Sequence, residues 1–206
     1  LKALKDALEN EKLAETVAVK PEEAKVKHNL NLLTAKPLIY VGNVSESAYA
    51  DPAKDRYFPK VEAFAAASNA LAIPICAETE AQLASVSPTE RQEYLAALGT
   101  DVTGLDRITV AAYKALGLRT FFTGGPDEVR AWTFREGWTA PQCAGVIHTD
   151  MERGFIKAEV YAYADLDKYG TEAALREKGL IRTEGKEYVV KDGDCLFIKF
   201  NAPKGK

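Results

Sequence analysis

Two short groups of residues follow apolar segments and are of types that could contact a ligand. Asn43-Val44-Ser45-Glu46 comes after the apolar run 38–41, and Cys76-Ala77 comes after the apolar run 71–75. An asparagine amide both donates and accepts hydrogen bonds, a glutamate carboxylate accepts them, and the small Ala77 leaves its backbone N–H accessible. Such residues suit the polar edge of a base. Taken singly, Asn43 is more often a turn cap, and Cys76 a buried structural thiol.

The Asn-x-x-Glu spacing is similar to the Asn-Lys-x-Asp motif by which P-loop GTPases bind guanine. In that motif the acid accepts hydrogen bonds from ring nitrogen 1 and the exocyclic amine of guanine. Adenine has no donor at ring nitrogen 1, so a carboxylate there would face an acceptor. Here Val44 replaces the lysine and Glu46 replaces the aspartate, so the strict guanine motif is absent. The Asn43 amide would instead accept from the adenine amino group and donate to ring nitrogen 7.

Other combinations indicate little chemistry. His148 and Asp150 form a potential acid–base pair, but no serine or cysteine nucleophile with a matching partner lies nearby, so we expect them to hydrogen-bond a local turn. The three cysteines are widely spaced and only two histidines are present, so we expect no metal site.

The elements that would position Asn43 and Cys76 form a β-α-β unit. We predict helices over 1–17 and 20–33, strands over 38–41 and 71–76, and a helix over 57–70 between the strands. Pro74 favours an edge strand or a strand end. Ser87-Pro88-Thr89-Glu90 is a capping box that starts a helix ending near Gly99, and another helix is predicted over 104–116. Ligands of parallel sheets bind where the strands end, at Asn43 and Cys76.

The residues after about Leu118 predict a small β-grasp domain. We expect strands over 119–123, 129–134 and 155–163, a turn at 124–126, and helices over 139–148 and 171–178. A hairpin of 188–190 with 195–200 would close the sheet. Most of the aromatic residues in this part are expected in its core. Basic and aromatic side chains that could meet RNA are Arg130, Trp132, Arg153 and Lys157.

Composition excludes several classes. The chain has 206 residues, 47% hydrophobic and 28% charged, with a net charge of -3, which is not the balance of a strongly basic nucleic-acid-binding protein. Apolar runs are too short for a membrane span, the N-terminus does not resemble a signal peptide, and scattered cysteines suit the cytoplasm. Residue 1 is leucine and the single methionine is Met151, so we expect the chain to be part of a longer protein.

Seven stretches, which together sample the whole chain, resemble the YchF-type Obg-like ATPases. They are 36–46 (KPLIYVGNVSE), 104–108 (GLDRI), 113–118 (YKALGL), 120–133 (TFFTGGPDEVRAWT), 139–150 (TAPQCAGVIHTD), 152–158 (ERGFIKA) and 184–194 (EGKEYVVKDGD).

The resemblance implies an α/β fold with three parts. Residues 1–36 would end an inserted helical domain, 37–118 would be the C-terminal half of a P-loop nucleotide-binding domain, and 119–206 would be a TGS domain of the β-grasp, ubiquitin-like type. It places Asn43, Val44 and Glu46 on the base-contact motif and Cys76-Ala77 on the following loop.

The resemblance also implies an activity and partners. The full protein would be a cytoplasmic, monomeric ATPase that uses ATP and Mg²⁺, associates with ribosomes or RNA, and acts as a switch in translation or stress response. This chain has no Gly-x-x-x-x-Gly-Lys-Ser/Thr motif, so we expect no catalytic residue, no Mg²⁺ ligand, very weak nucleotide binding and no ATP hydrolysis in it.

Two other interpretations remain. This part of the protein could be an RNA- or ribosome-binding adaptor without catalysis, which RNA or ribosome pelleting without nucleotide would favour. A remnant of a Ras-like GTPase would need an aspartate where Glu46 stands.

Overall fold

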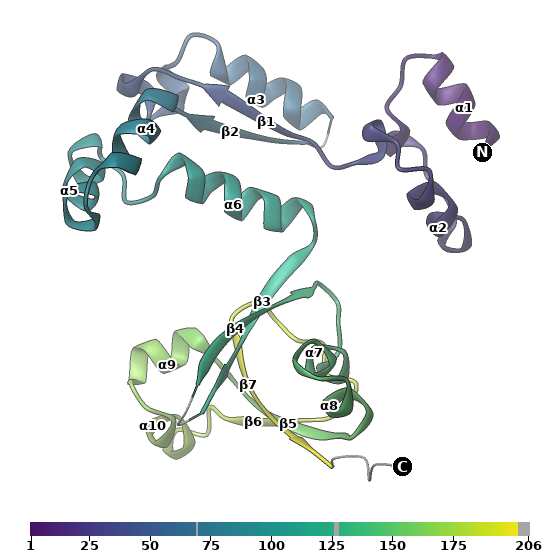
Figure 1. The fold of residues 1–206 in the computed structure, drawn as a ribbon, viewed down its shortest axis with the longest axis vertical. Coiled ribbons are helices and arrows are strands. Elements are labelled where there is room, and N and C mark those ends of the chain that lie inside the picture. The colour runs from purple at the N-terminus through teal and green to yellow at the C-terminus, as the bar shows by residue number, and fades with distance from the viewer. Residues whose placement is uncertain (69, 126–127, 202–206) are drawn as a thin grey trace. The chain divides into compact units, whose positions relative to one another are not determined.

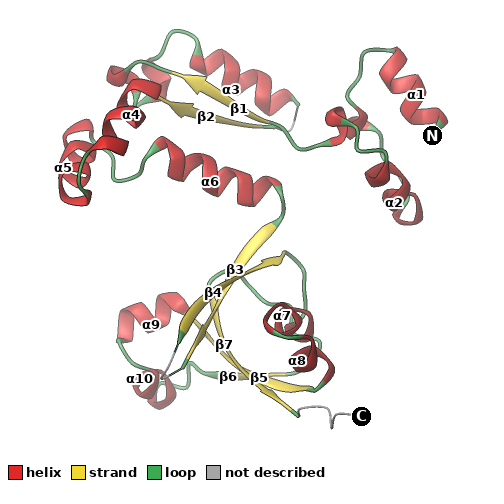
Figure 2. Cartoon of the chain, in the orientation of Figure 1, coloured by secondary structure: helices red, strands yellow, loops and turns green. Residues whose placement is uncertain are grey.

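The computed structural model describes residues 1–68, 70–125 and 128–201 (Figure 1). The chain divides into two compact units, Leu1–Leu116 and Gly117–Lys206, here called unit 1 and unit 2. Helices and strands occur in both units (Figure 2). Each unit is described by itself.

Unit 1 begins with two short helices, α1 (Lys2–Glu9) and α2 (Pro21–Asn29). The prediction of helices to Val17 and Leu33 was too long. Glu11 and Asn31 both adopt positive φ angles, 56° and 49°, which end regular helix after α1 and α2. Single 3₁₀ turns, η1 (Ala14–Thr16) and η2 (Leu33–Ala35), follow the helices.

The β-α-β unit predicted from the sequence is present. β1 (Ile39–Asn43) and β2 (Leu71–Ile75) pair in parallel, with Asn43 opposite Ile75. The connection contains the 3₁₀ turns η3 (Glu46–Ala48) and η4 (Pro52–Lys54) and the helix α3 (Phe58–Ala67). The predicted helix was longer at both ends, and residue 69 within it lies outside the described residues.

Close packing of α3 on β1 explains the glycine in this strand. A Cβ at Gly42 would lie 2.6 Å from a ring carbon of Phe58, whose side chain is 5% exposed. Any larger residue at position 42 would push Phe58 out of the cluster it forms with Val44 and Ala48.

Three further helices follow β2 in the described part of unit 1. They are α4 (Ala77–Ser85), α5 (Pro88–Leu98) and α6 (Gly104–Ala115). The Ser87 capping box is confirmed, because Ser87 and Glu90 bond reciprocally, and α5 ends at Gly99 with φ 82°. The sequence pattern did not predict α4. Helices α3 and α6 lie on opposite sides of the two-stranded sheet (Figure 1).

Unit 2 is a β-grasp fold. Its strands are β3 (Leu118–Gly124), β4 (Val129–Arg135), β5 (Phe155–Ala162), β6 (Arg182–Glu184) and β7 (Asp194–Phe200). They lie in the order β4-β3-β7-β5-β6, so that β3 and β7, the first and last strands of the unit along the chain, are side by side and parallel. The helices are α7 (Ala140–Ile147), α8 (Thr149–Arg153), α9 (Tyr163–Tyr169) and α10 (Glu172–Glu177).

The two faces of this sheet have separate cores. On one face Phe121, Phe134 and Leu196 pack against Ala140 and Cys143 of α7. Part of the other face is covered by α9 and α10, where Leu175 is fully buried. The face with α7 therefore holds the larger core.

The predicted closing hairpin is wrong. Val189 bridges Thr139 instead of pairing with β7. The intervening Asp192-Gly193 turn is hydrogen-bonded to β3, because Asp192 Oδ1 accepts from the Thr120 N–H and the Gly193 N–H donates to the Thr120 carbonyl. These bonds bring β7 beside β3 and β5 instead. Pro126, predicted in the turn between β3 and β4, lies outside the described residues.

Candidate functional site

The two candidate loops meet at the carboxyl edge of the β1–β2 sheet. Asn43 ends β1 and Ala77 begins α4 directly after β2. The Ala77 N–H donates to Asn43 Oδ1 at 3.0 Å, and both residues are exposed. Two groups separated by 34 positions in the chain therefore share one polar, solvent-facing edge, as the parallel pairing of their strands predicts.

The hydrogen bond between these residues limits what each can offer a ligand. Asn43 Oδ1 and the Ala77 N–H already satisfy one another, although the sequence pattern assigned both to a base. The Asn43 amide nitrogen is the donor that remains for a ring nitrogen of a base. A base that used Oδ1 or the Ala77 N–H would have to replace this bond.

The other candidates divide into exposed and buried side chains. Glu46 is exposed at the start of η3. Val44 and Cys76 are each only 5% exposed, so their side chains belong to the core. The Val44 N–H also donates to the Ile75 carbonyl at 2.7 Å, which leaves the backbone carbonyl of Val44 as its group for a ligand.

A second hydrogen-bond cluster lies behind this edge, and no sequence pattern had indicated it. The Tyr49 hydroxyl donates to Glu80 Oε1 at 2.6 Å and accepts from the Gly104 N–H at 2.8 Å. The Gly104 N–H also reaches Glu80 Oε1 at 2.6 Å, and Arg107 Nη1 donates to the Tyr49 carbonyl at 3.2 Å. Tyr49 follows the Asn43 loop and Glu80 is on α4, so the cluster joins both loops to the N-terminus of α6.

Glycine at the start of α6 is required by this cluster. A Cβ at Gly104 would lie 2.6 Å from Glu80 Oε1 and 2.8 Å from Ile75. The Glu80 carboxylate also compensates the unpaired N–H groups and the positive dipole end of the helix. The polar residues Glu80 and Tyr49 thus have a structural reason to be at this position.

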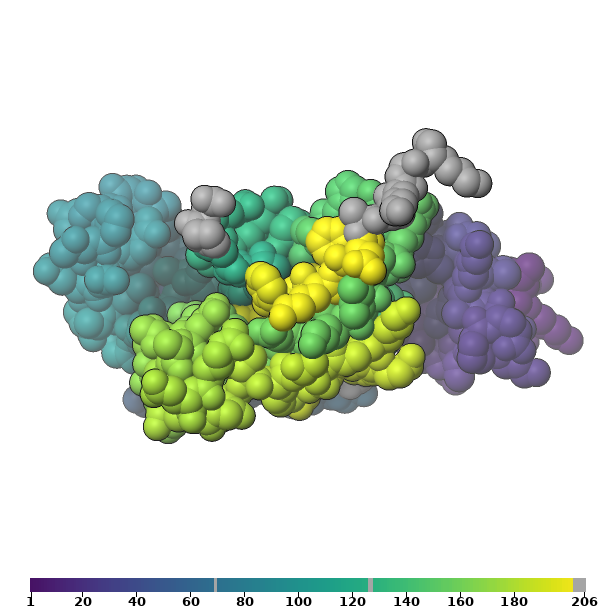
Figure 3. Space-filling view, turned by 90° about the horizontal axis from the view of Figure 1, so that it is seen from below, coloured from purple at the N-terminus to yellow at the C-terminus, as the bar shows by residue number. Residues whose placement is uncertain are grey.

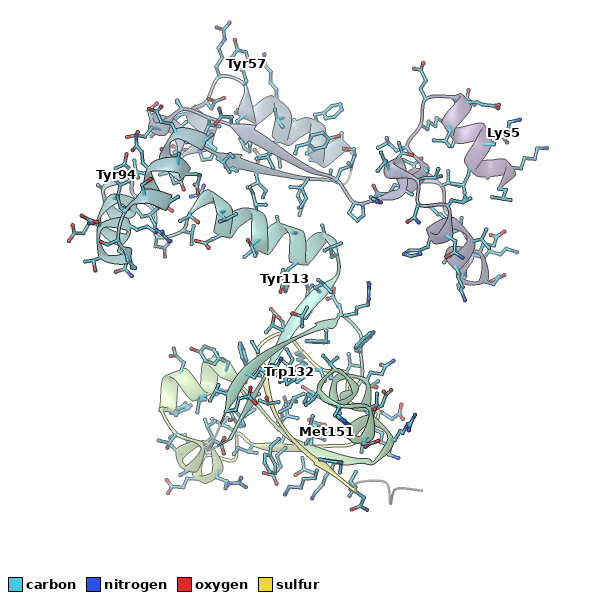
Figure 4. The ribbon with its side chains drawn as sticks, viewed as in Figure 1. Lys5, Tyr57, Tyr94, Tyr113, Trp132 and Met151 are labelled. Carbon is cyan, nitrogen blue, oxygen red and sulfur yellow. The ribbon has the colours of Figure 1, made fainter. Side chains whose placement is uncertain are left out.

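Tyr94 is a further residue near the site that no sequence pattern had indicated. It lies on α5, and its hydroxyl donates to Gln82 Oε1 at 2.7 Å (Figure 4). Burial, together with the nearby groups of Glu46, Cys76 and Glu78, raises the pKa of Tyr94.

The RNA-facing candidates of unit 2 do not form one surface. The Arg130 guanidinium lies 4.0 Å from the centre of the Trp132 ring. Trp132 packs against the core on the side of β4 that faces α7, and its Nε1 donates to Thr123 Oγ1 at 2.9 Å (Figure 4). Lys157 is exposed on β5 and alternates with the buried Ala158, so it points to the opposite face of the sheet. Arg153 is exposed at the end of α8.

His148 hydrogen-bonds its local turn, as the sequence predicted, but this turn joins the helices α7 and α8, and Asp150 takes part through its backbone N–H. His148 Nδ1 accepts from the Asp150 N–H at 3.1 Å and so caps α8. Within residues 1–68, 70–125 and 128–201, no three His, Cys, Asp or Glu side chains are grouped as metal ligands. No helix in the described part of the chain is long and apolar enough to cross a membrane.

Comparison with known proteins places this geometry in context. Residues 118–201 match the family described as YchF-GTPase_C, a protein of unknown function (DUF933). The chain is 48% identical over 201 residues to the "Ribosome-binding ATPase YchF" of Bacillus subtilis (strain 168), covering 98% of this chain and 55% of that protein. It is 45% identical over 185 residues to "Obg-like ATPase 1" of Rattus norvegicus, covering 89% and 46%.

Two solved structures also resemble this chain. The YchF GTPase of Schizosaccharomyces pombe superposes with a TM-score of 0.80 at 37% identity, covering 96% of this chain and 54% of that one. A GTP binding protein of Pyrococcus horikoshii OT3 has a TM-score of 0.56 at 18% identity, covering 97% and 64%, which is a likeness of fold alone. The chain thus spans about half the length of the curated relatives it matches.

The Tyr49 phenol gives a pH-dependent prediction. Burial and the Glu80 carboxylate raise the pKa of Tyr49 from 10.0 to about 12. A raised pKa means that the protonated phenol stabilises the fold fully below pH 10, and that this contribution is lost as pH rises to about 12. Tyr49→Phe should therefore lower the free energy of unfolding by about 1 kcal/mol at neutral pH, the typical net value of one hydrogen bond.

Urea unfolding followed by far-UV circular dichroism measures this difference. The gap between wild type and Tyr49→Phe should shrink as pH rises from 10 to 12. Tyr57→Phe is the matched control, since Tyr57 is 60% exposed, and it should behave as wild type. A gap that is unchanged at alkaline pH would rule out the stabilising role of the protonated phenol.

Proposed function

We propose a function from the premise that this chain belongs to the YchF family of Obg-like ATPases. In this proposal unit 1 supplies the base-binding side of an ATP site, and unit 2 is a TGS domain that contacts the ribosome. The whole protein hydrolyses ATP in the cytoplasm as a monomer and acts as a regulatory switch in translation or stress response. Residues 1–36 are the end of an inserted helical domain, and 37–118 the C-terminal half of the nucleotide-binding domain.

The exposed pairing of Asn43 with Ala77 carries the proposal. It lies at the carboxyl edge of parallel strands, where nucleotides bind to sheets of this class. In the proposed site the Asn43 amide nitrogen donates to ring nitrogen 7 of the purine. The backbone carbonyl of Val44 faces the adenine amino group, since the Val44 N–H already donates to the Ile75 carbonyl. Cys76 supports the loop from the core, and Ala77 leaves space for the base.

The side chains of the Asn-x-x-Glu motif support adenine over guanine. In the guanine motif an aspartate accepts from ring nitrogen 1 and the exocyclic amine, and here the longer Glu46 stands in its place. A Ras-like guanine site is disfavoured for a second reason. The lysine of its motif would replace Val44, whose side chain is buried beside Ala48 and Phe58.

The phosphate- and Mg²⁺-binding groups are proposed to belong to the part of the family protein that this chain does not span. Within the described residues β1 pairs with β2 alone, and Val41, Leu105 and Val110 are 46%, 66% and 69% exposed. Apolar side chains on a strand and a helix of a parallel α/β unit are ordinarily covered. Unit 1 offers donors that fit the base, and we assign no residue of this chain to Mg²⁺.

An adaptor function is the second candidate for this chain. Unit 2 has its own hydrophobic core on both faces of its sheet, with Phe121 and Leu175 fully buried. A domain with its own core can bind a partner without nucleotide.

Replacing Asn43 in the full-length protein tests the base site. Asn43→Ala removes one donor to the base and the bond to Ala77, so the Kd for ATP should rise about tenfold, since one hydrogen bond contributes roughly 1–1.5 kcal/mol. Isothermal titration calorimetry with ATP and with GTP measures both dissociation constants. The wild-type protein should bind ATP more tightly than GTP. Asn29→Ala, at an exposed position of α2, is the control. An unchanged ATP affinity in Asn43→Ala, or tighter binding of GTP by wild type, would contradict the proposed base site.

This chain by itself should not turn over ATP. It carries no phosphate-binding loop in its sequence, so the transferred phosphoryl group would have no positioning or charge stabilisation. A phosphate-release assay of the repurified 206-residue chain should give the rate of buffer alone. Turnover that co-purifies with the chain and remains after repeated purification would show that the catalytic groups lie within it.

A further inference from the structure

The face of the unit 2 sheet opposite α7 is partly open. Residues that alternate with the core side chains point to it: Lys157, Glu159 and Tyr161 on β5, and Cys195, Phe197 and Lys199 on β7. Helices α9 and α10 cover the part near Tyr161 and Cys195. In Figure 3 β7 (yellow) reaches the surface between the segment that contains α9 and α10 (lime green) and β3–β4 (teal).

Two adjoining hollows meet on this face. One is mainly apolar and is lined by Phe122, Tyr163 and Leu166. The other is charged and is lined by Glu159, Arg176 and Lys199. Both hollows are also lined by Tyr161, Glu172 and Phe197, so they lie side by side at those three residues. A ligand along this face would pass from aromatic to cationic surroundings.

Two features of this face are unusual for the middle of a sheet. Phe197 is 55% exposed on β7, the middle strand of the sheet, although its neighbours Leu196 and Ile198 pack in the core. Lys157 lies directly opposite Lys199 on the adjacent strand, and like charges in that position are destabilising. Lys199 is paired with Glu159 and its Nζ lies 5.8 Å from the centre of the Phe197 ring, so Lys157 and the open face of Phe197 are the features that a ligand would explain.

Charges on the face favour an anion. Glu159 is already shared by Lys199 at 2.5 Å and Arg176 at 3.1 Å. Glu172 accepts a hydrogen bond from the Tyr161 hydroxyl at 2.7 Å. The cations Lys157, Arg176 and Lys199 thus outnumber the two carboxylates, and Lys157 has no ion pair among the described residues. An anion between Lys157 and Lys199 would remove their repulsion.

We propose that this open face binds single-stranded RNA. A base stacks on Phe197, a second base lies in the apolar hollow beside Tyr163, and the phosphates between them meet Lys157 and Lys199. Aromatic rings flanked by cations on a sheet face are suited to unpaired bases, whose two faces are free to stack. The inference rests on the proposed ribosome contact and names the surface that makes it.

The alternative surface at Arg130 and Trp132 is less suited to RNA. There the guanidinium lies 4.0 Å from the centre of the indole ring, whereas Lys199 Nζ lies 5.8 Å from the centre of the Phe197 ring, and the indole N–H is bonded to Thr123. Phe121 packs near the same ring, with centroids 6.5 Å apart. A base would have to displace Arg130 in order to stack. Arg130 is on the face toward α7, so it offers a matched control from the same sheet.

Fluorescence anisotropy of the 206-residue chain with a short fluorescein-labelled oligouridine tests the proposal. Phe197→Ala should weaken binding about tenfold, since stacking contributes roughly 1–3 kcal/mol per base. Lys157→Gln with Lys199→Gln should reduce the salt slope of log K by about 1.4, at roughly 0.7 for each phosphate that is no longer neutralised. The Kd of Arg130→Ala for oligouridine should stay within about twofold of the wild-type Kd, because a change in binding free energy that small means that no contact is lost.

Folding of each variant is checked by tryptophan fluorescence during urea unfolding, because both tryptophans, Trp132 and Trp138, are in unit 2. Should Phe197→Ala unfold, Phe197→Leu provides the second test, since it keeps an apolar side chain and loses the aromatic ring. Binding by folded variants equal to wild type would overturn the proposal. So would no binding of oligouridine, or its displacement by polyglutamate at equal charge, which would indicate an acidic peptide as the ligand.

Ribosome co-sedimentation separates this inference from the proposed function. If wild type and Phe197→Ala both pellet with ribosomes, the ribosome contact stands and the open face is not its site. If wild type binds oligouridine through Phe197 but does not pellet, the RNA surface stands and the ribosome contact fails. Absence of pelleting in Phe197→Ala, with Arg130→Ala unchanged, supports both.

Discussion

The hydrogen bond from the Ala77 N–H to Asn43 Oδ1 is the interaction on which the candidate site depends. It joins the ends of two parallel strands at 3.0 Å and fixes which groups of each loop remain free. The Tyr49–Glu80 pair at 2.6 Å holds the same two loops from behind and seats the first turn of α6. The polar edge is therefore supported on both sides. Its chemistry is limited to an amide donor, a backbone carbonyl and the carboxylate of Glu46.

The sequence predicted which two loops meet at this edge better than it predicted which of their atoms are free there. Asn43 and Cys76 each follow an apolar strand, and parallel pairing alone brings such residues to one edge. Burial of the Val44 and Cys76 side chains depends on contacts with Phe58 and Tyr49 that come from other segments of the chain. The local pattern of apolar and polar residues does not show contacts between distant segments. Glu80 was missed for the same reason, since its partner Gly104 is 24 positions away.

Unit 2 shows a similar division. The alternation of strand residues indicated a β-grasp sheet, and most of its strands were predicted close to their observed bounds. The closing hairpin was wrong because Asp192 and Gly193 bond Thr120, a contact across most of the domain. Assigning Arg130 and Lys157 to one RNA surface also required knowing the face on which each residue lies. The pairing of the strands places them on opposite faces of the sheet. Arg130 lies over Trp132, and Lys157 is the one that is free to meet a nucleic acid.

The most direct test of the base site is a crystal structure of the full-length protein with a non-hydrolysable ATP analogue. We predict the purine beside Asn43, with ring nitrogen 7 within hydrogen-bonding distance of the Asn43 amide nitrogen and the amino group toward the Val44 carbonyl. An adenine bound elsewhere, with the Ala77 N–H still bonded to Asn43 Oδ1 and no base beside the Asn43 amide nitrogen, would contradict this assignment.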